Sequence, residues 1–450
     1  MTAFLDLLPF ADMSRLELGF WSFAVLLFFI FLRAPIGLAM LLCGFGGWYF
    51  AMNGNPVPLL AKLKSETYTT FSSYSLTIIP LFLLMGQFAT LSGMSTALFK
   101  AAESFLGHRR GGVAMAAVGA CAGFGAICGS SLATAATMGK VALPELRRYG
   151  YSGGFSTATL AAGGTLGILI PPSVILVLYA IITEQNIAKL FLAAFIPGIL
   201  AAIGYVLTIS LYVRLYPNSA GTRPAVPMAE RWKALGNTWP VLMIFGLVVG
   251  GIYAGWFTPT EGAAIGAAGT GIVAMLSGNL KWPAFKVALL ETGKTTAMIF
   301  FIVLGASFYN GFLALSGVPQ IMADYVLAQG FSPWFVLIII LTFYLVFGCV
   351  MDSLSMILLT VPIFFPVISA MDFGLSPEHL AIWFGILVLI VVEVGLITPP
   401  VGMNLFIINA MDRETKITET YKAVMFFVGS DIVRVAILVA FPAITLFLIP

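Results

Sequence analysis

The chain has 450 residues, of which 60% are hydrophobic and 9% are charged, and its formal net charge is +3. Long apolar runs with so little charge are outside the range of soluble proteins and predict a polytopic membrane protein embedded in a lipid bilayer. The weak charge balance offers no basic surface, which excludes nucleic acid as a partner.

The apolar runs predict an all-α chain. A first helix, about 18–50, is interrupted at Pro35. The stretches 62–66 and 281–294 mix charged and apolar residues, which is typical of amphipathic arms at the membrane interface. The remaining helices are expected at about 75–93, 153–184, 189–214, 237–254, 259–277, 295–315, 379–410 and 421–449.

A segment at about 111–146 lies between arginine pairs at 109–110 and 147–148. Two full spans plus a turn would need roughly 40 residues or more, and this segment is shorter. The arginines place both of its ends in the cytoplasm by the positive-inside rule. We therefore predict a re-entrant helical hairpin whose tip lies at 123–131.

The second half contains a counterpart at about 333–372. It is flanked by Asp324, Asp372 and Glu378 and by no Lys or Arg, so this hairpin is expected to enter from the opposite, periplasmic side. Opposite flanking charge on equivalent elements is what inverted topology predicts.

Other motifs recur in the same order in both halves. Ala34-Pro-Ile-Gly is matched by Thr258-Pro-Thr-Glu-Gly, and Leu91-Ser-Gly is matched by Leu315-Ser-Gly. An ordered series of this kind indicates an internal repeat. The expected organisation is a first inverted repeat at 1–215, a polar linker at 216–236 and a second inverted repeat at 237–450.

Each half also contains a helix that a double proline breaks, Gly167-Ile-Leu-Ile-Pro171-Pro172 within 153–184 and Gly395-Leu-Ile-Thr-Pro399-Pro400 within 379–410. Proline has no N–H, so the carbonyls of Gly167 and Gly395 lose their usual donors, as do the carbonyls of Ile168 and Leu396. In hydrocarbon an unpaired carbonyl is costly, so these breaks must face protein, water or a cation. Sodium is a natural partner for such oxygens.

The hairpin tips carry polar residues. Ser130 and Ser131 could ligate a cation, or could simply belong to a small-residue stretch that lets helices pack closely, and the motif alone favours neither reading. Asp352 could ligate a cation, carry a proton or cap the hairpin turn, and the functional readings are favoured because it lies inside a long apolar run.

Four further charged residues lie within apolar segments. Glu261 and Glu393 could tune the sites or pair with a neighbour, and a structural role is slightly favoured for both. Asp431 and Arg434 are spaced i and i+3, so they are expected to neutralise each other rather than bind substrate.

Together these motifs resemble the large membrane subunit of the TRAP (tripartite ATP-independent periplasmic) transporters, the DctM-like family, from about residue 17 to the C-terminus. The residues that carry the resemblance are Gly125-Ala-Ile-Cys-Gly-Ser-Ser131 with Thr134-Ala-Ala, Pro144-Glu145, Gly150-Tyr151, Gly164-Thr-Leu-Gly-Ile-Leu-Ile-Pro-Pro-Ser173, Thr258-Pro-Thr-Glu261 and Gly395-Leu-Ile-Thr-Pro-Pro-Val-Gly-Met-Asn-Leu-Phe406.

The resemblance implies an elevator-type sodium symporter of a bacterial inner membrane and not an enzyme. Na⁺ is the coupling ion, and no organic cofactor is expected. The implied partners are a separate small four-helix membrane subunit and a periplasmic binding protein that delivers a carboxylate solute, such as a C4-dicarboxylate or a sugar acid like sialic acid. The alternative is a stand-alone sodium/anion symporter of related fold that needs no binding protein.

The resemblance also implies where sodium and solute bind. Sodium holds each hairpin tip on its broken helix, which completes a substrate site between the two tips. The first sodium site carries over to Gly125, Gly129, Ser130, Ser131, Gly167, Ile170 and Pro172. The second carries over to Gly348, Asp352, Gly395, Thr398 and Val401. The substrate region is expected at Ser131, Thr165, Ser353, Thr398 and Asn404.

Overall fold

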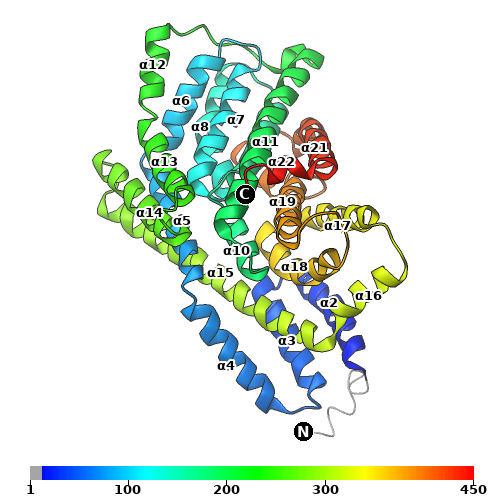
Figure 1. The fold of residues 1–450 in the computed structure, drawn as a ribbon. Coiled ribbons are helices and arrows are strands. Elements are labelled where there is room, and N and C mark those ends of the chain that lie inside the picture. Colours follow the sequence, from blue (N-terminus) through cyan, green and yellow to red (C-terminus); the bar gives the residue numbers. More distant parts are fainter. Residues whose placement is uncertain (1–12, 450) are drawn as a thin grey trace.

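The computed structural model describes residues 13–449, and every regular element within them is a helix (Figure 1). The α-helices are α2 (Arg15–Phe31), α3 (Ile36–Ala51), α4 (Pro56–Ser72), α5 (Ile78–Leu91), α6 (Met94–Leu106), α7 (Gly112–Cys128), α8 (Ser131–Arg148), α9 (Gly153–Leu169), α10 (Val174–Ile182), α11 (Ile187–Leu215), α12 (Met228–Gly236), α13 (Trp239–Tyr253), α14 (Pro259–Leu276), α15 (Trp282–Ser316), α16 (Val318–Ala328), α17 (Pro333–Gly348), α18 (Ser353–Ser369), α19 (Pro377–Gly395), α20 (Met403–Met411), α21 (Ile417–Ala440) and α22 (Pro442–Leu446).

Several helices are long and apolar enough to cross a membrane. By length and composition, α11, α15, α19 and α21 qualify among the described residues. The bent pairs α4–α5, α9–α10 and α12–α13 raise the number to as many as seven if each pair is one span. This confirms that the chain is a polytopic membrane protein.

The predicted boundary between an arm at 281–294 and a helix at 295–315 is wrong. The structure has one helix, α15, of 35 residues. Pro283 lies in its first turn, where proline is tolerated, and the helix ends only at Gly317, which has φ 76°. Lys294 and Glu291 form an exposed ion pair of 2.8 Å, so the charges of the expected arm lie along the helix surface.

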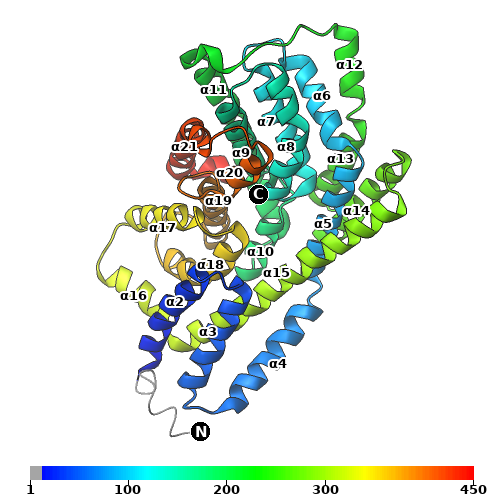
Figure 2. The same cartoon turned by 180° about the vertical axis from the view of Figure 1, so that it is seen from behind.

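Two groups of helices make up the molecule. Helix α15 runs diagonally across it and packs on α2, α3, α4 and α5 (Figures 1 and 2). Helix α14 packs along α5, and α13 packs on α14. In the second group α9 packs against α7, α8, α11, α20 and α21, and α19 packs against α17 and α18. Both groups contain helices from both halves of the sequence. In the first group α15 of the second half packs on helices of the first half, and in the second group α20 and α21 of the second half lie on α8 and α9 of the first.

Polar contacts fasten α20 and α21 to the first half. Asn404 Nδ2 donates to the carbonyl of Ala161 at 3.2 Å. The Arg147 guanidinium, at the end of α8, forms an ion pair with the buried carboxylate of Asp412, which also accepts from the Thr415 hydroxyl at 2.9 Å. A buried charge needs such a partner, so these contacts hold α8 and the α20–α21 turn as one unit.

The predicted hairpins and breaks correspond to paired helices. Helices α7 and α8 are joined by Gly129, which has φ 64°, and Ser130, and helices α17 and α18 by residues 349–352. The chain leaves helical geometry at 170–173 and again at 396–402, where the double prolines lie. Helices α9 and α10 meet there at a bend of 46°.

Candidate functional site

The tip of the first helix pair rests directly on the first break. A Cβ built on Gly125 would lie only 2.5 Å from the Cα of Gly167, and one built on Gly129 would lie 3.0 Å from the Pro172 carbonyl oxygen. Ser130 caps α8, and its carbonyl oxygen lies close to Gly167. The residues expected to form the first sodium site are therefore brought together, and two glycines make the backbone contact possible.

The second tip meets the second break in the same way. A Cβ built on Gly395 would lie 2.6 Å from the Cα of Gly348. The N–H of Gly402 donates to the carbonyl of Cys349 at 3.1 Å, which ties the far side of the break to the tip. Thr398 and Val401 lie within the break, and the Thr398 hydroxyl bonds back to the Val394 carbonyl at 2.7 Å.

The two breaks differ in how their carbonyls are satisfied. Residue 171 is proline, so the Gly167 carbonyl has no i+4 donor, and α9 closes with Ile170 N donating to the Leu166 carbonyl at 3.1 Å. Residue 400 is also proline, so the Leu396 carbonyl loses its i+4 donor as expected, but the N–H of Asn404 donates to it at 3.1 Å. The chain turns back at Gly402, which has φ 65°, and so supplies a donor from beyond the prolines. The Gly395 carbonyl accepts from the Thr398 N–H at 3.0 Å.

Each tip also carries a buried hydroxyl that the sequence prediction missed. Thr134 Oγ1 in the first turn of α8 and Ser355 Oγ in the first turn of α18 have no hydrogen-bond partner within residues 13–449. The thiol of Cys128, a weak hydrogen-bonding group, lies beside Thr134. Unpaired buried oxygens are costly, so these two hydroxyls suit a hard cation. The Thr134 hydroxyl lies beside Gly167 at the first glycine contact.

Asp352 makes the structural contact that was one of its three readings. It is the N-cap of α18, and its carboxylate accepts from the Ser355 N–H at 3.0 Å. Glu261 likewise forms a capping box with Thr258 at the start of α14, which confirms the structural role favoured for it.

The residues expected around substrate do not all converge. Thr165 is turned toward the Tyr205 hydroxyl at 3.0 Å, and Asn404 and Thr398 bond to the backbone carbonyls named above. Ser131 and Ser353, the first residues of α8 and α18, do converge, and both adjoin the carboxyl group of Glu393.

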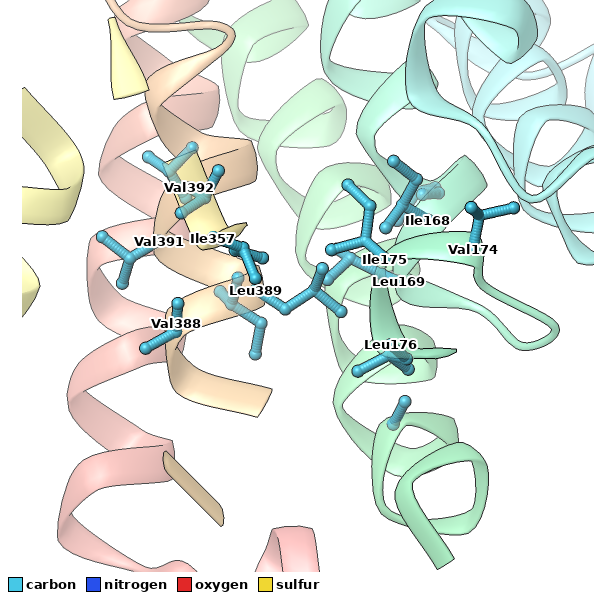
Figure 3. Close-up of a cluster of buried hydrophobic side chains, with 14 of the residues drawn as sticks. Ile168, Leu169, Val174, Ile175, Leu176, Ile357, Val388, Leu389, Val391 and Val392 are labelled. Carbon is cyan, nitrogen blue, oxygen red and sulfur yellow. The ribbon is translucent and has the colours of Figure 1, made fainter. Parts of the chain in front are cut away.

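Apolar side chains fill the space between the first break and α19. Leu169 and Ile175 come from the α9–α10 region, Ile357 from α18 and Leu389 from α19, and all four are buried (Figure 3). They surround this space with apolar atoms, so electrostatic interactions beside it act in a medium of low dielectric constant.

Asp431 and Arg434 form the expected pair, at 2.9 Å, and the Tyr205 hydroxyl donates to Asp431 at 2.8 Å. A separate polar cavity of about 480 Å³ lies between the two helix groups. Its lining includes Lys62, Asn310 and Gln320.

An all-helical, membrane-spanning chain whose two broken helices are each covered by a helical hairpin tip has the architecture of a membrane transport protein. The chain belongs to the family of the tripartite ATP-independent periplasmic transporter, DctM component, whose model matches residues 23–444. It is therefore a transporter permease subunit and not an enzyme.

Named relatives agree with this assignment. The C4-dicarboxylate TRAP transporter large permease protein DctM of Pseudomonas aeruginosa is 39% identical over 353 residues, which cover 78% of this chain and 80% of that protein. The sialic acid TRAP transporter large permease protein SiaM of Vibrio cholerae is 31% identical and covers 84% of this chain and 86% of that protein.

A solved structure shares the fold. The YdaH transporter of Alcanivorax borkumensis superposes with a TM-score of 0.58 over 85% of this chain and 89% of that chain, at 15% sequence identity.

Proposed function

We propose that this chain is the large membrane subunit of a sodium-coupled uptake system in a bacterial inner membrane. A periplasmic binding protein delivers the solute, and a separate small membrane subunit braces this one. The solute carries a carboxylate. Relatives named for C4-dicarboxylates and for sialic acid support this solute class, and the greater identity with the former favours a C4-dicarboxylate.

One observation carries the proposal, the pair of glycine contacts at the breaks. Gly125 on Gly167 and Gly348 on Gly395 are equivalent contacts in the two halves. At the first contact, the Thr134 hydroxyl lies beside Gly167 and has no hydrogen-bond partner among the described residues. Backbone and hydroxyl oxygens gathered at a gap in a helix are the ligands that sodium prefers in transporters. Sodium at each contact would stabilise the closed position of its tip.

An elevator mechanism is consistent with the dimensions of the helices. Helices α7 and α17 have 17 and 16 residues, or about 25 Å, which is shorter than the hydrocarbon core of roughly 30 Å. The polar cavity beside α15 reduces the packing between the two helix groups, which favours sliding of one group along the other. The two halves would then be inverted repeats that move solute across together.

The membrane potential adds to the sodium gradient. Each net positive charge that moves inward at about 100 mV contributes roughly 2.3 kcal/mol, or about fifty-fold in accumulation. Two sodium ions with a dianion would move no net charge, so transport current measured against solute charge gives the stoichiometry.

Reconstitution tests the proposal. The chain and its small subunit are placed in liposomes, and uptake of a radiolabelled C4-dicarboxylate is measured with the binding protein outside and an inward sodium gradient, with potassium as control. We expect uptake that requires both sodium and the binding protein. Uptake that ignores external sodium refutes the coupling, and full uptake without the binding protein favours the stand-alone symporter.

A further inference from the structure

Glu393 is buried beside the first residues of α8 and α18. It lies on α19, one turn before the second break, and its side chain is fully buried. Ser353 Oγ, at the start of α18, donates to Glu393 Oε1 at 2.7 Å. The hydroxyl of Ser131, at the start of α8, is its second polar neighbour. A single carboxyl group thus adjoins the first residue of both tip helices.

The starts of two helices adjoin the Glu393 carboxyl group. Residues at a helix N-terminus carry unpaired N–H groups and the positive end of the helix dipole. Ser131 and Ser353 are the first residues of helices of 18 and 17 residues, so two such ends adjoin the Glu393 carboxyl group. Oε2 has no hydrogen-bond partner in the part of the chain that the structure describes, so the group can accept further bonds.

We infer that Glu393 is the positioning residue that couples the two hairpin tips. By accepting from Ser353 and interacting with Ser131, it makes closure of one tip favour closure of the other. When substrate is bound between the tips, both tips are then closed or both are open. The inference rests on the proposed function only in treating the tips as gates, and it assigns Glu393 no direct contact with sodium.

The other charged groups that act on Glu393 are already paired, so none of them couples the two tips. Asp431 and Arg434 of α21 act on it through space, but they are paired with each other. The Tyr205 hydroxyl of α11 also donates to Asp431.

The chain carries its own probes of tip opening. Cys128 ends α7 and Cys349 caps α17, so each tip has one buried cysteine, while Cys43 lies on α3 in the other helix group. Alkylation of each cysteine is followed by mass spectrometry in the assembled complex in lipid nanodiscs at saturating sodium. Cys43 reports unfolding of the whole chain.

We expect Glu393→Ala to raise the alkylation rates of Cys128 and Cys349 by about tenfold or more, because it removes the acceptor of a buried hydrogen bond. Cys43 should keep its rate. Glu393→Gln retains an acceptor for Ser353 and should fall between wild type and Glu393→Ala. Ser353→Ala should also raise the rate at Cys128, on the other tip, and should lose that effect in the Glu393→Ala background.

Three results overturn the inference. Unchanged rates at both tips remove Glu393 from any gating role. A rise confined to Cys349 shows that the Ser131 side is not coupled. Equal rises at Cys43 and at the tips in both Glu393 variants show a purely structural role. The proposed function fails separately, if sodium does not protect Cys128 and Cys349 in the wild-type protein.

Discussion

Adding one methyl group at the first glycine contact should disable sodium coupling. Ordinary carbon contacts are about 3.5–4.0 Å, whereas a Cβ on Gly125 would lie 2.5 Å from the Gly167 Cα, so Gly125→Ala must push the tip away by about 1 Å. Overpacking costs roughly 1–3 kcal/mol, and a cation held by oxygens loses its ligands over such a distance. We expect the sodium concentration for half-maximal uptake to rise about tenfold or more.

The same helix offers a matched control. A Cβ on Gly119 of α7 would meet no described atom within 4 Å, so Gly119→Ala makes the same chemical change without the clash. Both variants are reconstituted with their partners, and uptake is titrated with sodium, with thermal unfolding measured alongside. If Gly125→Ala shows the same sodium dependence as Gly119→Ala, the glycine contact is not the site of coupling.

Two further predictions concern single side chains. Thr134→Ala and Ser355→Ala should each raise the half-saturating sodium concentration by several-fold without lowering the melting temperature. The reason is that each hydroxyl lacks a protein partner within the described chain. A lowered melting temperature with unchanged sodium dependence would contradict this. Arg147→Ala should destabilise the protein by about 3 kcal/mol, since it leaves the buried Asp412 carboxylate unpaired, while the exposed Arg148→Ala should cost less than about 1 kcal/mol. Thermal unfolding in detergent compares the two, and equal losses would refute the explanation.

The broken helices could be predicted from local chemistry alone. Pro171 and Pro399 lack the N–H that a helix needs, so the breaks at 170–173 and 396–402 follow from the residues themselves. The pairing of Asp431 with Arg434 is equally local, because residues three apart share one face of a helix.

One local prediction was wrong, and one was incomplete, for physical reasons. The sequence suggested an arm ending before residue 295, but charged residues do not end a helix when they lie on its exposed face, so α15 continues to Ser316. The Leu396 carbonyl loses its usual donor as expected, but the sequence did not show that the turn at Gly402 supplies the N–H of Asn404 in its place.

By itself, the sequence determined that this is a helical membrane protein with two interrupted helices and two polar turns, since periodicity, proline chemistry and flanking charge act over a few residues. Only the tertiary structure decided what those turns meet. It brought Gly125 onto Gly167, left the hydroxyls of Thr134 and Ser355 without a partner among residues 13–449, and set Glu393 between both tips. These features depend on packing between segments tens to hundreds of residues apart, which no local pattern encodes.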